Sequence, residues 1–234
     1  MSSFLDLLFP HICVLCKAPS KRDFDLCLDC EHELPHIKFS CEQCGLPLAV
    51  NQAQCGSCLT DPPAFDATKS LFFYESPIDF LVLALKFNNN LLYANLFGEL
   101  LTLHLQNYYR DRKHPEVIIP VPLHRDRLRE RGYNQALEIA RPVAKKLNIP
   151  INKFSCVRFK NTLQQSALTF SERKQNIKNA FAVAKPLHAK YVAIIDDVVT
   201  TGYTVNEFSK SLRQAGVEKI DVWCVARTPQ KNNC

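Results

Sequence analysis

The sequence of 234 residues predicts an α/β protein, in which a parallel sheet is flanked by helices and preceded by a small cysteine-rich module. Two observations support this fold class. From about residue 63 onward, strand-like and helix-like segments alternate, and the last of them form a strand, helix, strand unit with a short crossover, which makes the two strands parallel. Eight of the 11 cysteines precede residue 59. We therefore predict two domains, 1–62 and 63–234, joined near Asp61-Pro62-Pro63.

The cysteines of the first domain form four Cys-x-x-Cys pairs, with ten residues between one pair and the next: Cys13/Cys16, Cys27/Cys30, Cys41/Cys44 and Cys55/Cys58. A Cys-x-x-Cys turn directs two thiolates at one centre, and tetrahedral zinc takes two such turns. The module therefore predicts two closed sites for structural zinc. We expect consecutive pairs to share a site, because a ten-residue hairpin can close each site locally, and interleaved pairing is the alternative. We expect His11, His32 and His36 on the surface.

The elements of the second domain follow from apolar periodicity, capping residues and chain breakers. They are a helix over 78–110 interrupted at 88–90, a strand at 117–121, a helix at 134–147, a strand at 154–159, a helix near 171–179, a short strand through 183, a strand at 191–195, a helix at 203–215 and a strand at 219–226. The final three elements are the clearest, because a buried apolar run precedes the helix and Gly216 ends it.

Charge is unevenly distributed along the chain. Residues 1–65 carry 4 basic and 8 acidic side chains, and the remaining residues carry a net charge of +10. With 47% hydrophobic and 22% charged residues, the composition excludes collagen, coiled coil and disorder. No uncharged apolar run reaches the length of about 18 residues that a membrane span needs. The apolar N-terminus lacks a basic flank, so we expect a cytoplasmic protein without membrane insertion.

The join inside the final strand, helix, strand unit reads Asp196-Asp197-Val198-Val199-Thr200-Thr201-Gly202-Tyr203-Thr204. Ligands of open α/β sheets bind at the carboxyl ends of the strands, and a helix N-terminus there offers amide groups to an anion. The threonines add hydroxyl donors, Gly202 permits close backbone approach, and the two carboxylates can reach sugar hydroxyls or a magnesium ion. We therefore expect a ribose-phosphate site. The alternative is a simple helix cap after a strand.

Residues 192–204 resemble the phosphoribosyl pyrophosphate (PRPP) motif of type I phosphoribosyltransferases: four apolar residues, two acidic, two apolar, then Thr-Thr-Gly-x-Thr. Further stretches are similar to the ComF competence family, whose members pair a cysteine-rich zinc module with a phosphoribosyltransferase-like domain. They are Pro120-Val-Pro-Leu-His124, Arg127-Leu-Arg-Glu-Arg-Gly-Tyr-Asn-Gln135, and the spaced set Arg158, Thr162, Gln165, Leu168, Arg173, Asn176, Ala180 and Phe181. Lys86-Phe87-Asn88-Asn89 stands where the family usually has Lys-Tyr-x-Gly.

This resemblance implies a type I phosphoribosyltransferase-like sheet with an N-terminal double zinc ribbon. It implies a role in natural transformation on incoming single-stranded DNA, PRPP with magnesium as ligands, and other competence proteins as partners. In the implied site, Asp196 and Asp197 are the catalytic candidates and hold the ribose hydroxyls, while Thr200 to Thr204 hold the 5′-phosphate. The remaining PRPP-binding candidates are Val198, Val199, Lys86, Arg127, Arg129, Arg131 and Arg158, and 158–165 is the implied mobile loop.

The run Arg125-x-Arg-x-Arg-x-Arg131 has three interpretations: a pyrophosphate site, a nucleic-acid backbone site, or a surface salt-bridged by Asp126 and Glu130. The aromatic residues Tyr108, Tyr109, Phe159, Tyr203 and Trp223 form no interleaved platform in the sequence, so base stacking is not indicated. Two functions follow. One is phosphoribosyl transfer to an acceptor, and the other is a non-catalytic adaptor that binds PRPP or DNA phosphates and uses the zinc module for protein contacts.

Overall fold

A four-stranded sheet forms the centre of the larger domain in the computed structural model, which describes residues 10–88, 90–161 and 177–229. Its strands are β1 (Ala67–Phe73), β6 (Lys219–Arg227), β5 (Tyr191–Val199) and β2 (Val117–Pro120), in this spatial order. All three pairings are parallel. Two short strands, β3 (Cys156–Arg158) and β4 (Phe181–Val183), pair antiparallel in a separate sheet.

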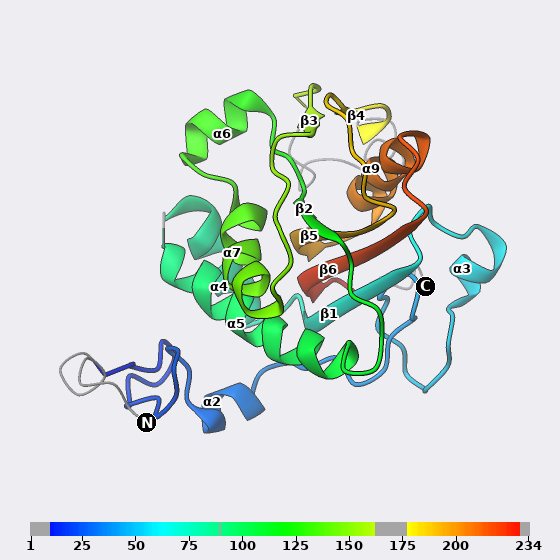
Figure 1. Cartoon of the computed structure of the whole chain (residues 1–234). Coiled ribbons are helices and arrows are strands. Elements are labelled where there is room, and N and C mark those ends of the chain that lie inside the picture. Colours follow the sequence, from blue (N-terminus) through cyan, green and yellow to red (C-terminus); the bar gives the residue numbers. More distant parts are fainter. Residues whose placement is uncertain (1–9, 89, 162–176, 230–234) are drawn as a thin grey trace.

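Helices cover both faces of the parallel sheet (Figure 1). They are α4 (Ile78–Phe87), α5 (Leu91–Tyr108) and α7 (Gln135–Leu147) on one face, and α9 (Tyr203–Gln214) on the other. Successive residues of a strand point to opposite faces, so Ile195 packs in the core under α5 and α7, whereas Ile194 packs under α9. Strands that are buried on both faces read as continuous apolar runs, as β5 does. The predicted α/β fold, a parallel sheet flanked by helices, is confirmed.

The crevice for a ligand arises where β2 and β5 lie side by side. The helix α7, which follows β2, packs on one face, and α9, which follows β5, packs on the other. Connections that diverge in this way open a crevice at the carboxyl ends of the two strands. The pairing of β2 with β5 ends at Pro120 and Ile195, so the last four residues of β5 extend past β2 along the crevice.

The boundaries of several elements differ from those predicted. Residues 196–199, expected in a loop, belong to β5, because their backbone continues to pair with β6 as far as Arg227. The strand β1 was not predicted, and neither was α6 (Arg125–Arg131), a short helix without buried residues that is capped by His124. The helix expected near 171–179 lies mostly outside the described residues.

The N-terminal module consists of two small units with one short helix each, α2 (Leu28–His32) and α3 (Gly56–Thr60). Figure 1 shows α2 and α3 on opposite sides of the larger domain. The first unit buries Leu26 and Leu34 in the core on the α5 side of the sheet, and the second forms a core of its own around Cys41, Cys55 and Cys58. No helix in the described ranges carries an apolar stretch long enough to cross a bilayer.

Candidate functional site

The eight cysteines of the N-terminal module gather into two groups of four, in which all ligand atoms lie within 4.8 Å of one another: Cys13, Cys16, Cys27 and Cys30 (the first cysteine group), and Cys41, Cys44, Cys55 and Cys58 (the second cysteine group). A Zn–S bond of about 2.3 Å places the sulfurs of a tetrahedral site about 3.8 Å apart. The Sγ atoms of Cys16 and Cys27 are 3.7 Å apart, and those of Cys44 and Cys55 are 3.6 Å apart. Both groups therefore fit structural zinc, and consecutive pairs share a site, as predicted.

In the first cysteine group, the pKa values of Cys13 and Cys30 are shifted in opposite directions. Burial raises the pKa of Cys13, but the amide groups of Cys27, Cys16 and Leu15 outweigh burial and hold that pKa at about 6. Burial and the adjacent thiols raise the pKa of Cys30. Four ionised thiols at this spacing repel one another, so the group is built for a divalent cation.

A cavity of about 270 Å³ lies at the crevice between β2 and β5. Nine of the residues predicted for PRPP binding line it: Lys86, Arg127, Arg131, Arg158, Asp196, Asp197, Val198, Thr200 and Thr204. Four cationic side chains face two carboxylates, which leaves a net charge of +2 when both carboxylates are ionised. Such a balance favours an anionic ligand that also carries hydroxyl groups or a metal ion for the carboxylates.

The acidic pair lies at the end of β5, beside the last turn of α4. Asp197 is 7% exposed, and its Oδ2 lies 2.9 Å from Nζ of Lys86. Burial lowers the pKa of Lys86, but the charge of Asp197, its hydrogen bond to Lys86 and the charge of Asp196 together outweigh burial and raise that pKa overall. Burial together with the charge of Asp197 raises the pKa of Asp196 to about 7. Asp197 thus has an ion-pair partner at contact distance, and the raised pKa of Asp196 holds that carboxyl closer to neutrality than a solvated aspartate.

The arginines of α6 separate into two sets. Arg127 and Arg131, one helical turn apart, line the cavity, whereas the side chain of Arg129 is 81% exposed and lies 3.9 Å from Asp126. Arg158 enters the cavity from β3 and is 8% exposed. Burial and the charge of Arg127 lower the pKa of Arg158 to about 10, and burial with the charge of Arg131 lowers that of Arg127. The cavity therefore concentrates positive charge, while Arg129 belongs to the salt-bridged surface.

The loop between β5 and α9 is only three residues long, Thr200 to Gly202. Gly202 has a φ of 81°, which glycine adopts without strain, and it caps the N-terminus of α9. The Oγ1 atom of Thr201 accepts a hydrogen bond from the amide of Tyr203 at 3.5 Å. Val199 is buried in β5, and Thr201, Gly202 and Tyr203 are not among the cavity-lining residues. The cavity thus meets the loop through Thr200 and the first turn of α9 through Thr204.

Sequence reasoning missed part of the wall. Tyr74, Leu83 and Phe87 form an apolar side of the cavity, and Asn134 and Gln135 contribute amide groups. Oε1 of Gln135, whose residue is 2% exposed, accepts a hydrogen bond of 3.1 Å from Arg131. A polar residue at a buried position of a helix was the signal that could have identified Gln135. Of the implied mobile loop, only 158–161 lies within the described residues.

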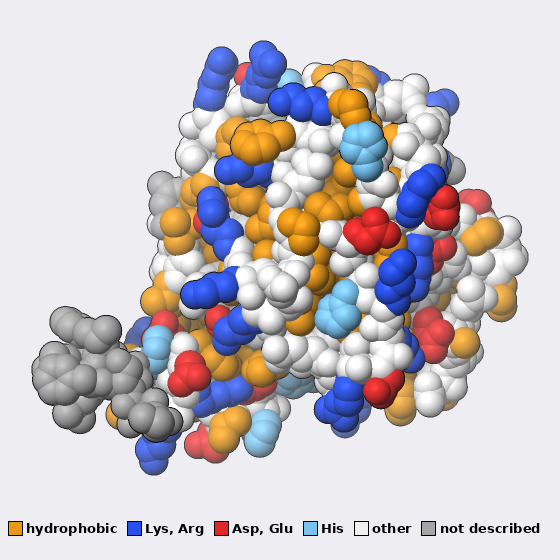
Figure 2. All heavy atoms as spheres, in the orientation of Figure 1, with side chains coloured by type: hydrophobic (Ala, Val, Ile, Leu, Met, Phe, Trp, Pro, Cys, Tyr) orange, Lys and Arg blue, Asp and Glu red, His pale blue; other side chains and the backbone are white. Residues whose placement is uncertain are grey.

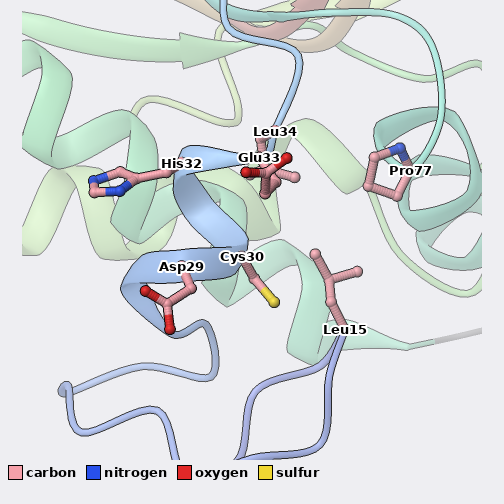
Figure 3. Close-up of a pocket in the computed structure, with 7 residues that line it drawn as sticks. All are labelled: Leu15, Asp29, Cys30, His32, Glu33, Leu34 and Pro77. Atoms are coloured by element: carbon pink, nitrogen blue, oxygen red, sulfur yellow. The ribbon is translucent and has the colours of Figure 1, made fainter.

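Another cavity, of about 390 Å³, lies between the first cysteine group and the start of α4. Figure 3 shows the thiol of Cys30 directed toward Leu15, with Pro77 lying across from Leu34. The charged and titratable residues that line this cavity besides Cys30 are Asp29, His32 and Glu33, and neither Lys nor Arg is among the described residues that line it. Because its charge is negative and its thiol belongs to the metal group, this cavity is not a phosphate site.

Comparisons with known proteins bear on both domains. The double zinc ribbon domain family matches residues 4–59. Competence protein F of Haemophilus influenzae is 38% identical over 207 residues, which cover 86% of this chain and 90% of the relative. The chain belongs to the ComF family. DNA utilization protein YhgH of Shigella flexneri, another relative of this ComF protein, is 33% identical and covers 95% of this chain and 99% of its own length.

Two further proteins are similar to this chain at lower sequence identity. Competence protein ComFC of Bacillus subtilis is 26% identical, with 84% of this ComF chain and 81% of the relative covered. A purine phosphoribosyltransferase from Pyrococcus horikoshii superimposes on 58% of the chain and 83% of its own, at 17% identity and a TM-score of 0.33. The resemblance to the ComF family noted in the sequence is confirmed by the curated relatives.

Proposed function

We propose that this ComF protein binds PRPP together with magnesium in the cavity between β2 and β5, and that it acts in the cytoplasm on single-stranded DNA during natural transformation. The observation that carries the proposal is the cavity itself. Three guanidinium groups and Lys86 face two carboxylates beside the N-terminus of α9. PRPP has the matching chemistry, since it joins a 5′-phosphate, a ribose with free hydroxyls and a pyrophosphate in one molecule.

Each part of the ligand has a counterpart in the wall. The loop from Thr200 to the first turn of α9 suits the 5′-phosphate, because helix N-termini stabilise anions. Arg127 and Arg131 suit the pyrophosphate, whose charge would relieve their mutual repulsion. Asp196 and Asp197 suit the ribose hydroxyls and offer the oxygen ligands that magnesium prefers. Bound magnesium would neutralise part of the pyrophosphate charge.

Calorimetric titration of the zinc-loaded full chain with PRPP and magnesium tests the proposal. We expect Arg127→Ala and Arg131→Ala each to weaken binding by about tenfold or more, the scale of losing a charge-assisted hydrogen bond. Arg129→Ala is the matched control, because this arginine has the same chemistry on the same helix but faces solvent. An equal effect of all three substitutions, or no heat of binding with the parent protein, would refute the assignment.

Pyrophosphate release separates an enzyme from an adaptor. If the chain transfers the phosphoribosyl group, pyrophosphate appears in proportion to an added acceptor, and nucleobases and oligonucleotides are the acceptors to try. If the chain only senses PRPP, binding occurs without release. The protein would then use its double zinc ribbon to contact other competence proteins, which pull-down with the isolated partners would test.

Binding of single-stranded DNA is favoured by a separate feature, the exposed face of α4. Phe80, Leu83 and Phe87 follow one another at helical spacing and are 64%, 46% and 53% exposed. Leu83 and Phe87 reach the cavity, and the guanidinium of Arg131 lies 5.4 Å from the centre of the Phe87 ring. Exposed aromatic rings beside phosphate-binding cations are the features on which sequence-independent binding of single strands depends. Figure 2 shows apolar and basic side chains interspersed over one face of the molecule.

A further inference from the structure

The guanidinium of Arg227 connects the second cysteine group to the phosphate loop. Arg227 is the last residue of β6 and is 5% exposed. Its Nε donates a hydrogen bond of 3.1 Å to the carbonyl of Cys44. Its Nη1 donates to the carbonyls of Val199, at 3.1 Å, and of Thr200, where β5 passes into the loop. One buried side chain therefore spans a metal-binding turn and the loop beside the cavity.

The contacts of Arg227 determine which way the loop amides face. In a trans peptide the N–H points opposite to the carbonyl of the same unit. Because Arg227 holds the carbonyls of Val199 and Thr200, the N–H groups of Thr200 and Thr201 are turned to the opposite side. The buried positive charge beneath the loop also favours an anion above it. Loss of these contacts would weaken the hold on two consecutive peptide units next to the cavity, of which the first keeps the hydrogen bond of 3.2 Å from the amide of Thr228 to the carbonyl of Val199.

At its other end, the Cys41-x-x-Cys44 turn is seated firmly on β1. Thr68 donates from its amide to the carbonyl of Glu42 at 2.9 Å and from Oγ1 to the carbonyl of Gln43 at 2.7 Å. Gly45, with a φ of +67°, lies so close that a Cβ there would be 2.6 Å from Cγ2 of Thr68. The carbonyl of Cys44 thus has a fixed position, provided that the turn keeps its shape.

The shape of that turn depends on the metal site, because Cys41 and Cys44 supply two of its four thiols. The first cysteine group has a different attachment. Two backbone hydrogen bonds hold the segment that follows its unit to β1. The amide of Ile37 donates to the carbonyl of Leu71, and the amide of Phe73 donates to the carbonyl of Pro35. Among the described cysteines of the two groups, only Cys44 of the second group has its carbonyl hydrogen-bonded to Arg227.

We propose that Arg227 is a positioning residue that couples the second cysteine group to the phosphate loop, so that loss of metal at this site weakens binding of a phosphate ligand in the cavity. The inference rests on the proposed PRPP site for its ligand, but the coupling itself concerns only this chain's own contacts. It assigns the second zinc ribbon a role in regulating the site, in addition to its structural role.

Matched double variants separate the two metal sites. Cys55→Ser with Cys58→Ser removes half of the second group, and Cys27→Ser with Cys30→Ser removes the equivalent half of the first. Elemental analysis should find one zinc ion in each variant. Hydrogen–deuterium exchange of the amides of 199–204 is the direct readout, and PRPP titration with magnesium is the second. We expect faster exchange and about tenfold weaker binding in the second-site variant only.

Arg227→Gln tests the link without touching a metal ligand. This variant should retain two zinc ions and still show faster exchange at 199–204 and weaker PRPP binding, and Arg227→Lys should restore part of both. Unchanged exchange in Arg227→Gln, or equal effects of the two double variants, would overturn the coupling. If the parent protein does not bind PRPP, the proposed function fails, and the exchange measurements still decide whether the metal site and the loop are coupled.

Discussion

Nζ of Lys86 lies 2.9 Å from Oδ2 of Asp197 and so joins the last turn of α4 to the acidic end of β5. The lysine side chain is 21% exposed and the aspartate side chain 10%. Removing one partner of such a pair leaves the other buried and unpaired. The pair therefore holds α4 to the sheet and presents Asp197 at the cavity.

We predict that Lys86→Met lowers the free energy of unfolding by about 1–3 kcal/mol, the cost of leaving a buried charged group without its partner. Urea unfolding at neutral pH measures this change. Lys145→Met is the control, because this lysine is exposed in the last turn of α7. Equal unfolding midpoints for Lys86→Met and the parent protein would show that the ion pair adds no net stability.

The raised pKa of Asp196 predicts how the free energy of unfolding depends on pH. Burial and the charge of Asp197 raise its pKa from 3.8 to about 7. Between these two values the folded state binds the proton more strongly than the unfolded state, so the contribution of Asp196 to stability falls as pH rises. We expect Asp196→Asn to become more stable relative to the parent protein between pH 5 and pH 8. Urea unfolding of both proteins at these two pH values measures the difference, which would be constant if Asp196 titrated normally.

Zinc content tests the N-terminal module. We predict about two zinc ions per chain, since both groups of thiols have the spacing that zinc requires. Chelation should unfold the module, because its own apolar core is too small to fold without metal. Elemental analysis measures the content, and circular dichroism follows the effect of chelator. One ion per chain, or a module whose structure survives chelation, would contradict the prediction.

Much of this architecture can be predicted from the sequence, because the residues that indicate it lie within short stretches of the chain. Cys-x-x-Cys spacing defines the thiol groups, the apolar run 191–195 defines the central strand, and Asn134 marks the start of α7, where its Oδ1 accepts from the amide of Leu137. Asp196, Asp197 and the threonine run were identified in the same way, because they adjoin a strand and a helix.

The remainder depends on contacts between distant segments. Lys86 and Asp197 are 111 positions apart, and nothing in either local stretch pairs them. Arg127 and Arg129 look equivalent in the sequence, and only their placement on α6 turns one toward the cavity and the other toward solvent. Arg227 directly follows the predicted strand at 219–226, and nothing in that stretch indicates that its side chain reaches Cys44, which is 183 residues away.

Two substitutions near the cavity mouth should affect single-stranded DNA differently. We predict that Phe87→Ala weakens oligonucleotide binding by about 1–3 kcal/mol through lost stacking and leaves the salt dependence unchanged. Arg131→Ala should instead flatten the slope of log affinity against log salt by about 0.7, the contribution of one phosphate. Fluorescence anisotropy at several salt concentrations measures both quantities. Arg129→Ala serves as the control, and a slope change as large as that of Arg131→Ala would move the DNA site to the outer face of α6.

A structure of the full chain crystallised with PRPP and magnesium tests the central claim most directly. The account predicts the 5′-phosphate on the loop from Thr200 to Thr204, the ribose hydroxyls on Asp196 and Asp197, and the pyrophosphate facing Arg127 and Arg131. Density for the ligand anywhere else on the protein, with the cavity between β2 and β5 left to solvent, would contradict it.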